Sequence, residues 1–195
     1  MSGPGPERVR ADIKRRLRSI SSEAFFYYYL FVDNVTSTIL RFLGEIGIRV
    51  REGVVADGSF LPGIEVENGS LIVDRSKLKY PGDLLHEAGH LAVVPAPIRY
   101  ALSGEVKIPD EHPGVVEMVA MLWSYAACLH LRVDPAVVFH EHGYYGRSQR
   151  LLFSYQMGIY PGVYDLENAG MTLSPQNAEL TGREAFPVMQ KWIRD

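Results

Sequence analysis

The chain has 195 residues, 47% of them hydrophobic, and a formal net charge of −3 with histidine counted as neutral. This length suits one compact domain with extensions, and it allows a sizeable core. The small negative charge excludes nucleic acid as an expected partner, and the composition is that of an ordinary soluble protein. Because Cys128 is the only cysteine, a disulfide framework and a cysteine-based metal site are also excluded. We therefore expect a cytoplasmic location.

The first part of the sequence is expected to lie outside the main core. Residues 1–6 form a flexible lead containing glycine and proline, and residues 7–33 form an N-terminal helical extension. Residues 24–32 are an aromatic and apolar run, which is too short for a membrane span and starts too late for a signal peptide. Since the run is apolar on every face, we predict that it is buried in the core or between copies of the chain in a homo-oligomer.

Residues 34–131 are expected to form the core of the domain. Asn34 is placed to cap a helix that Gly47 can close. Apolar and polar residues then alternate as they do in strands, and Asn68-Gly69 predicts a two-residue hairpin turn between two short strands.

The next predicted helix follows a turn at Pro81-Gly82. Asp83 is placed to cap this helix, and Pro95 ends it. Residues 98–109 are expected to be a loop.

This helix carries the motif His-Glu-Ala-Gly-His at residues 86–90. On a helix, His86 and His90 lie on one face, so both imidazoles can reach one metal ion while Glu87 stands beside them. Apolar residues flank the motif, which predicts burial, and a buried histidine needs a partner. A catalytic zinc ion takes three protein ligands and leaves a position for water, whose proton a neighbouring carboxylate can accept. The motif therefore predicts a zinc site with Glu87 as general base.

The third ligand must come from elsewhere in the chain. A longer motif with a third histidine is excluded, because Val93 and Ala96 occupy its glycine and histidine positions. Glu117 is a lone carboxylate near the start of a long apolar helix expected over residues 114–131, where burial without a cation would be costly. We favour Glu117 as the ligand. The reserve candidates, just before that helix, are Glu111 and His112.

Residues 132–195 are expected to be a helical C-terminal part. Short helices are predicted after Pro135, over residues 148–157 and near residues 176–179, followed by a final amphipathic piece ending in Trp192.

Between these helices lies a polar stretch, residues 140–147, which is either a connector or a source of hydrogen-bond donors for an oxyanion. We name Tyr144 and His142 as the catalytic candidates. The wider set of possible donors comprises His140, His142, Tyr144, Tyr145 and Arg147.

The order of these elements resembles the compact gluzincin arrangement of the zincin metallopeptidases. The resemblance covers residues 34–131 and rests on His86, Glu87, His90 and Glu117. It implies an α+β fold in which a small sheet with a hairpin packs on the HExxH helix, beside a second helix that bears a ligand. It also implies zinc, hydrolysis of peptide bonds and Glu87 as general base. The sequence departs from the pattern in its last third, and it has no recognisable partner for the oxyanion.

Three functions are compatible with these residues. The first is a zinc-dependent peptidase acting on a peptide or a small amide. The second is a zincin-like domain that binds or regulates without turnover, and the third is a metal-dependent hydrolase of a non-peptide amide or ester. An open fourth position on the metal favours an enzyme, whereas a position filled by a protein group favours the binding module.

Overall fold

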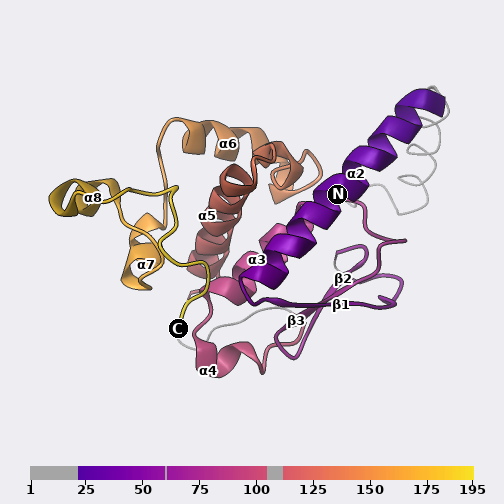
Figure 1. Cartoon of the computed structure of the whole chain (residues 1–195), viewed down its shortest axis with the longest axis horizontal. Helices are drawn as coiled ribbons and strands as arrows, with labels where there is room; N and C mark the ends of the chain where they lie inside the picture. The colour runs from indigo at the N-terminus through magenta and orange to yellow at the C-terminus, as the bar shows by residue number, and fades with distance from the viewer. Residues whose placement is uncertain (1–21, 60, 105–111) are drawn as a thin grey trace, which may run out of the picture. The chain divides into compact units, whose positions relative to one another are not determined.

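A computed structural model describes residues 22–59, 61–104 and 112–195. The chain divides into two compact units, Met1–Val35 and Thr36–Asp195. The described part of the chain has an α+β fold with seven α-helices, two short 3-10 helices and one three-stranded sheet (Figure 1). The prediction of an α+β fold is confirmed. The candidate site lies entirely within the second unit.

The first described helix, α2 (Ser22–Glu45), is continuous. The prediction that Asn34 caps a helix is therefore wrong, because helical spacing of apolar residues continues on both sides and nothing interrupts the backbone there. The helix ends as predicted, with Gly47 in the left-handed conformation at φ +88°. Leu30 and Phe31 are 49% and 53% exposed, so this end of the aromatic run is not buried in the core. Contact between copies of the chain through this run stays a prediction, and the expectations for residues 1–21 lie outside the described residues.

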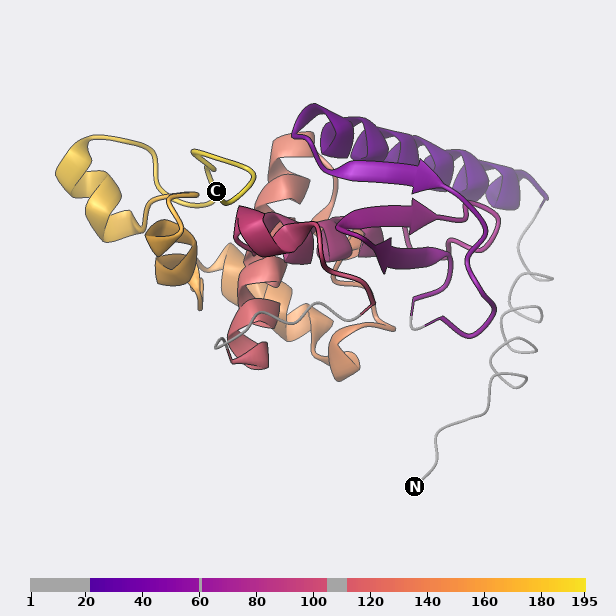
Figure 2. The ribbon, with the colours of Figure 1, turned by 90° about the horizontal axis from the view of Figure 1, so that it is seen from below.

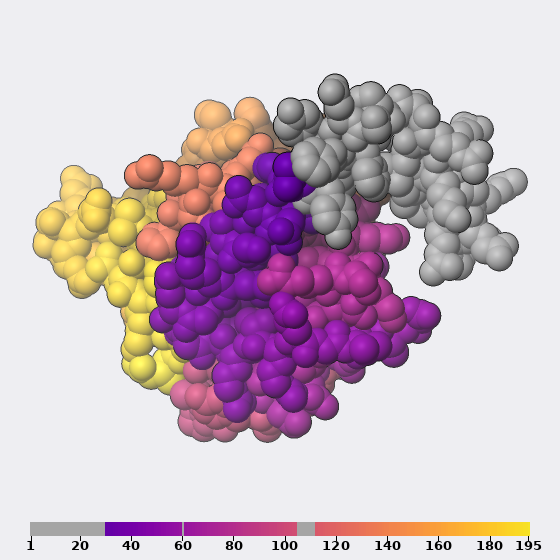
Figure 3. Space-filling view, turned by 45° about the vertical axis from the view of Figure 1, so that its right-hand side comes forward, coloured from indigo at the N-terminus to yellow at the C-terminus, as the bar shows by residue number. Residues whose placement is uncertain are grey.

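The sheet contains β1 (Arg49–Glu52), β2 (Ile64–Glu67) and β3 (Ser70–Val73). Strand β3 lies in the middle, parallel to β1 and antiparallel to β2 (Figure 2). Asn68 and Gly69 both have positive φ, as a tight two-residue hairpin turn requires, which confirms the predicted hairpin. In the space-filling view the C-terminal part of α2 and the strands that follow it form one continuous surface (Figure 3).

The HExxH motif lies on α3 (Asp83–Val93), which begins directly after Gly82. Asp83 is the first residue of this helix and makes no capping hydrogen bond, so its predicted role as a cap is wrong. Its carboxylate instead bonds the imidazole of His140, with Oδ1 and Nε2 3.0 Å apart. Gly82 allows a close approach of the chain here, since a Cβ atom would lie 2.0 Å from the carbonyl oxygen of Val137.

The long apolar helix α5 (Pro113–Leu131) crosses α3 at close range (Figure 1). By length and apolar composition α5 could cross a membrane, but 56% of its most apolar window is buried inside the fold. A core helix meets the same test. Ser124 connects the two helices, because its Oγ lies 3.1 Å from the carbonyl oxygen of Leu85 on α3 and 2.7 Å from that of Ala120 on α5.

Gly89 is the residue of α3 that permits this crossing. A Cβ atom at this position would lie 2.8 Å from the carbonyl oxygen of Ala120 and 3.1 Å from Ser124 Oγ. We expect Gly89→Ala to lower the free energy of unfolding, because overpacking costs about 1–3 kcal/mol and outweighs the gain of about 0.5–1 kcal/mol from alanine in a helix. Chemical denaturation measures this. The matched control is Gly44→Ala in α2, where a Cβ meets nothing within 4 Å and a small stabilisation is expected. Equal stability of Gly89→Ala and wild type would contradict the close packing.

The C-terminal end of α3 is held by two arginines. The guanidinium of Arg99, in α4 (Ala96–Arg99), is buried and donates to the carbonyl oxygens of Leu91 and Val94, both at 2.8 Å. The backbone N–H of Arg194 donates to the carbonyl oxygen of Ala92 at 2.9 Å. These donors bind carbonyls that the helix leaves unpaired, and positive charge is favourable at a helix C-terminus. The end of α3 that carries His90 is therefore firmly held.

Of the elements after α5, α7 and α8 lie on the side of α5 away from the sheet (Figures 1 and 2). The predicted helices near residues 135, 148–157 and 176–179 are present, whereas the six-residue α7 was not predicted. The final segment forms no helix. Trp192 instead packs edge-on against Phe42, and its carbonyl oxygen accepts a 2.9 Å hydrogen bond from Trp123 Nε1. The elements are η1 (Pro135–Val137), η2 (Tyr144–Gly146), α6 (Ser148–Gln156), α7 (Val163–Asn168) and α8 (Pro175–Thr181).

Candidate metal centre

Three predicted ligands come together where α3 and α5 cross. His86 Nε2 lies 3.2 Å from His90 Nε2, and the two nitrogens lie 3.4 and 3.2 Å from the carboxylate oxygens of Glu117. Within the part of the chain that the structure describes, this is the one group of three or more His, Cys, Asp or Glu side chains whose ligand atoms all lie within 4.8 Å of one another. The i, i+4 spacing on α3 aligns the imidazoles, and α5 supplies the carboxylate.

The spacing of these atoms fits a tetrahedral metal ion. Zinc binds nitrogen and carboxylate oxygen at about 2.0–2.2 Å, so the ligand atoms of a tetrahedral site lie about 3.3–3.5 Å apart. The separation of 3.2 Å between the two imidazole nitrogens is close to that edge length, and each nitrogen has its own Glu117 oxygen nearby, Oε1 at 3.4 Å from His86 and Oε2 at 3.2 Å from His90. The donor set of two imidazoles and one carboxylate is also one that zinc accepts.

The electrostatics of the cluster favour a cation between its members. Burial opposes the negative charge of Glu117, but hydrogen bonds with His86 and His90 outweigh it and hold the pKa of that carboxyl well below its usual range. Burial likewise opposes protonation of His86, yet the neighbouring Glu117 carboxylate raises the pKa of the imidazole. Positive charge is therefore favourable at this point, whether protons or a metal ion supply it.

Solvent reaches the cluster from the side of α5. The side chain of Glu117 is 44% exposed, whereas those of His86 and His90 are 14% and 12% exposed. The imidazoles are thus held in the packed interior while the carboxylate faces outward. Solvent therefore reaches the carboxylate more readily than the imidazoles.

Glu87 is close to the cluster without belonging to it. Burial raises the pKa of its carboxyl, the charges of His90 and His86 lower it, and Glu117 raises it further. Among the described residues Glu87 has no hydrogen-bond partner. A carboxylate with a raised pKa and no partner is suited to accept a proton from a molecule that enters the site.

Of the residues predicted from the polar stretch, Tyr144 is the one that contacts a ligand. Its hydroxyl lies 3.2 Å from Nδ1 of His86, the ring nitrogen that faces away from Glu117. Burial raises the pKa of the Tyr144 hydroxyl, and the Glu117 charge adds to this effect. The hydroxyl therefore stays protonated at neutral pH.

The remaining residues of this stretch lie away from the three ligands. His142 is 60% exposed and its Nε2 lies 3.4 Å from the carboxylate of Glu141, while the side chain of Tyr145 is fully exposed. Arg147 is also exposed. A catalytic role for His142 or Tyr144 stays a prediction.

Asp83 and His140 form a pair that sequence reasoning missed. Besides its bond to Asp83, the imidazole of His140 stacks on Tyr80, with ring centroids 4.0 Å apart. Asp83 shares a face of α3 with His86 and His90, because the three are separated by three and four residues. That spacing was visible in the sequence, but nothing in the sequence indicated its contact with His140.

Of the two reserve ligands, the structure describes His112, which does not join the cluster. Glu111 lies outside the described residues. His112 caps α5, with its Nδ1 accepting a 3.1 Å hydrogen bond from the backbone N–H of Gly114.

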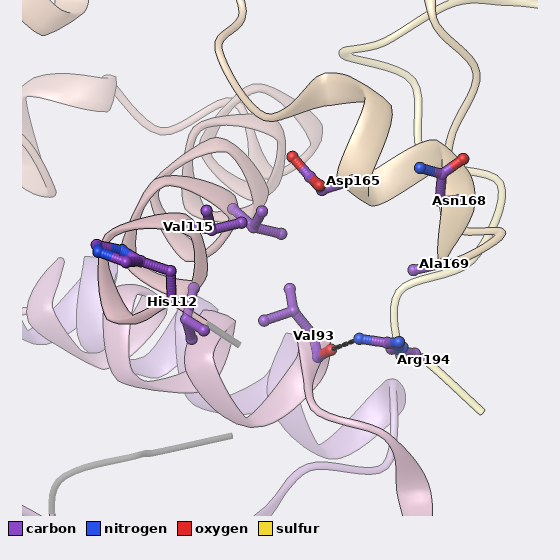
Figure 4. Close-up of a pocket in the computed structure, with 9 residues that line it drawn as sticks. Val93, His112, Val115, Asp165, Asn168, Ala169 and Arg194 are labelled. Carbon is purple, nitrogen blue, oxygen red and sulfur yellow. Dashed lines mark hydrogen bonds between the residues drawn. The ribbon is translucent and has the colours of Figure 1, made fainter. Parts of the chain in front are cut away.

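The side chain of His112 instead lines a separate hollow of about 230 Å³ between α3, α5 and α7 (Figure 4). Arg194 reaches this hollow and donates to the carbonyl oxygen of Val93 at 3.2 Å. None of the three predicted metal ligands lines it.

Comparison with known proteins adds no assignment: no family, no curated protein and no solved structure matches this chain.

Proposed function

We propose that the protein is a zinc-dependent hydrolase, and that peptides or small amides are its substrates. The proposal depends on one observation: the Nε2 atoms of His86 and His90 lie 3.2 Å apart, and each lies 3.2–3.4 Å from an oxygen of the Glu117 carboxylate, so one metal ion can reach all three side chains. Zinc is the metal of choice because two imidazoles and one carboxylate leave one position of a tetrahedron open, as in catalytic His₂Glu sites.

A gluzincin-like core is part of the same proposal. A mixed sheet with a hairpin precedes α3, which carries the HExxH motif, and α5 brings the later glutamate against it. This order supports the resemblance inferred from residues 34–131.

The chemistry is divided among a few side chains. A zinc ion, when bound, would lower the pKa of a water molecule and polarise a substrate carbonyl. His86, His90 and Glu117 would hold the ion. Glu87 would accept the proton of the attacking water on its carboxylate, which has no other hydrogen-bond partner among the described residues. It would then return that proton to the leaving amine.

Metal content tests the ligand set. We expect about one zinc per chain in the wild-type protein, measured by elemental analysis after dialysis, and substantially less in Glu117→Gln, because a neutral amide replaces a charged ligand of similar shape. The control is His112→Ala, which removes the reserve ligand and should leave the zinc content unchanged. Full zinc content in Glu117→Gln together with loss in His112→Ala would overturn the assignment of the third ligand.

A hydrolysis screen tests the reaction. The wild-type protein is incubated with mixed peptides, small amides and esters, with and without prior removal of the metal by a chelator. Peptide cleavage that is lost with the chelator and restored by zinc supports the peptidase. Cleavage confined to esters or non-peptide amides supports a metal-dependent hydrolase of those substrates instead. Zinc bound at full stoichiometry with no turnover in any arm overturns the hydrolase in favour of a binding module.

A further inference from the structure

We propose that Tyr144 is a positioning residue, which holds the imidazole of His86 so that its Nε2 lone pair faces His90 and Glu117. This inference rests on the proposed metal site and deepens it. Tyr144 was considered above as a donor to an oxyanion, but its position assigns it a different task.

The hydrogen-bond chemistry of His86 places a proton on the ring nitrogen that faces Tyr144. A neutral imidazole carries one N–H, and metal binding through Nε2 leaves that proton on Nδ1. The hydroxyl oxygen of Tyr144 lies 3.2 Å from Nδ1, so it is placed to accept this N–H. Groups that bond the far nitrogen of a ligand histidine set its tautomer and its ring orientation.

The two histidines differ in the surroundings of Nδ1. Nδ1 of His90 is buried and has no hydrogen-bond partner among the described residues. Among the described residues, Tyr144 is therefore the hydrogen-bond partner for Nδ1 of His86, and Nδ1 of His90 has no such partner.

An unusual backbone turn presents the tyrosine. Tyr144 and Tyr145 both have φ +54°, followed by Gly146 at φ +74°. The left-handed region is unfavourable for a non-glycine residue, so two such residues in succession require compensation from the surrounding contacts. The result of this turn is that the Tyr144 hydroxyl reaches His86 while the Tyr145 side chain is fully exposed.

Hydrogen bonds and ring packing anchor this turn. Ser148 Oγ donates to the carbonyl oxygen of His140 at 2.6 Å, and the backbone N–H of Gly143 bonds the same oxygen at 3.1 Å. The ring of Tyr144 packs against Phe139, with centroids 5.1 Å apart. Because these contacts do not involve the hydroxyl, Tyr144→Phe should keep the ring in place and remove only the hydrogen bond to His86.

The experiment compares zinc affinity in Tyr144→Phe and Tyr145→Phe by competition with a chromophoric chelator. We expect a 10- to 100-fold loss of affinity in Tyr144→Phe, the usual effect of removing such a partner, and no change in Tyr145→Phe. The two variants make the same substitution in the same turn. Unaltered zinc affinity in Tyr144→Phe would overturn the inference. If wild type and His86→Ala bind zinc equally, or wild type binds none, the metal site itself fails and the inference fails with it.

A second measurement does not depend on the variant folding. In the cobalt-substituted wild-type protein, the Nδ1 protons of ligand histidines give shifted NMR signals whose exchange with solvent can be measured. We expect one of the two Nδ1 protons to lie close to the Tyr144 ring and to exchange more slowly than the other, which has no protein acceptor among the described residues. If neither proton contacts the Tyr144 ring, or if both exchange equally fast, the hydrogen bond is contradicted.

Discussion

His86→Ala and His90→Ala are each expected to abolish stoichiometric zinc binding. Each imidazole supplies one of three protein bonds, so its removal leaves two ligands for an ion that needs at least three to stay bound. The loss of affinity should exceed the roughly 100-fold that removal of an outer partner causes. Elemental analysis of the purified variants, together with chelator competition, measures it.

The control for this experiment is His142→Ala. The His142 side chain is 60% exposed and lies away from the three ligands, so its removal should leave both zinc content and stability unchanged. The folds of the two ligand variants are compared with that of the metal-free wild-type protein, so that the effect of losing an imidazole is separated from the effect of losing the metal. Full zinc content in both ligand variants would rule out the site.

Glu87→Gln is expected to retain zinc and to lose turnover by about 10²- to 10⁴-fold, the usual contribution of a general acid or base. The amide has nearly the shape of the carboxylate but cannot accept the proton of an attacking water molecule. The measurement is kcat/KM on whichever substrate the hydrolysis screen identifies, with zinc content determined on the same preparation.

The matched control is Glu65→Gln, which makes the same substitution on the exposed face of β2. It should behave as wild type in both zinc content and turnover. Wild-type turnover in Glu87→Gln would show that another group moves the proton. Loss of zinc in that variant would instead place Glu87 among the ligands.

The local elements of this fold could be predicted because their signals are local. Asn68 and Gly69 adopt positive φ more readily than other residues, so they identified the hairpin between β2 and β3. Pro113 begins α5, and the apolar spacing that follows it gave the extent of the helix. The same kind of reasoning failed at Asn34, where a good capping residue lies inside a continuous helix. A residue that can cap a helix does not start one when the helical spacing of apolar residues already continues on both sides of it.

The sequence by itself determined that His86 and His90 share a helix face with Glu87 beside them, since that follows from the helical repeat. It favoured Glu117 as third ligand but kept Glu111 and His112 in reserve, because their distance from α3 depends on how two helices cross. The tertiary structure brings Glu117 to the histidines through the close approach at Gly89.

The contact of Tyr144 with His86 also depends on the tertiary structure. The two residues are separated by 58 positions, and the contact depends on a left-handed turn that only the packed chain can stabilise. Helical periodicity and turn chemistry act over a few residues, whereas the approach of two backbones is a property of the whole core.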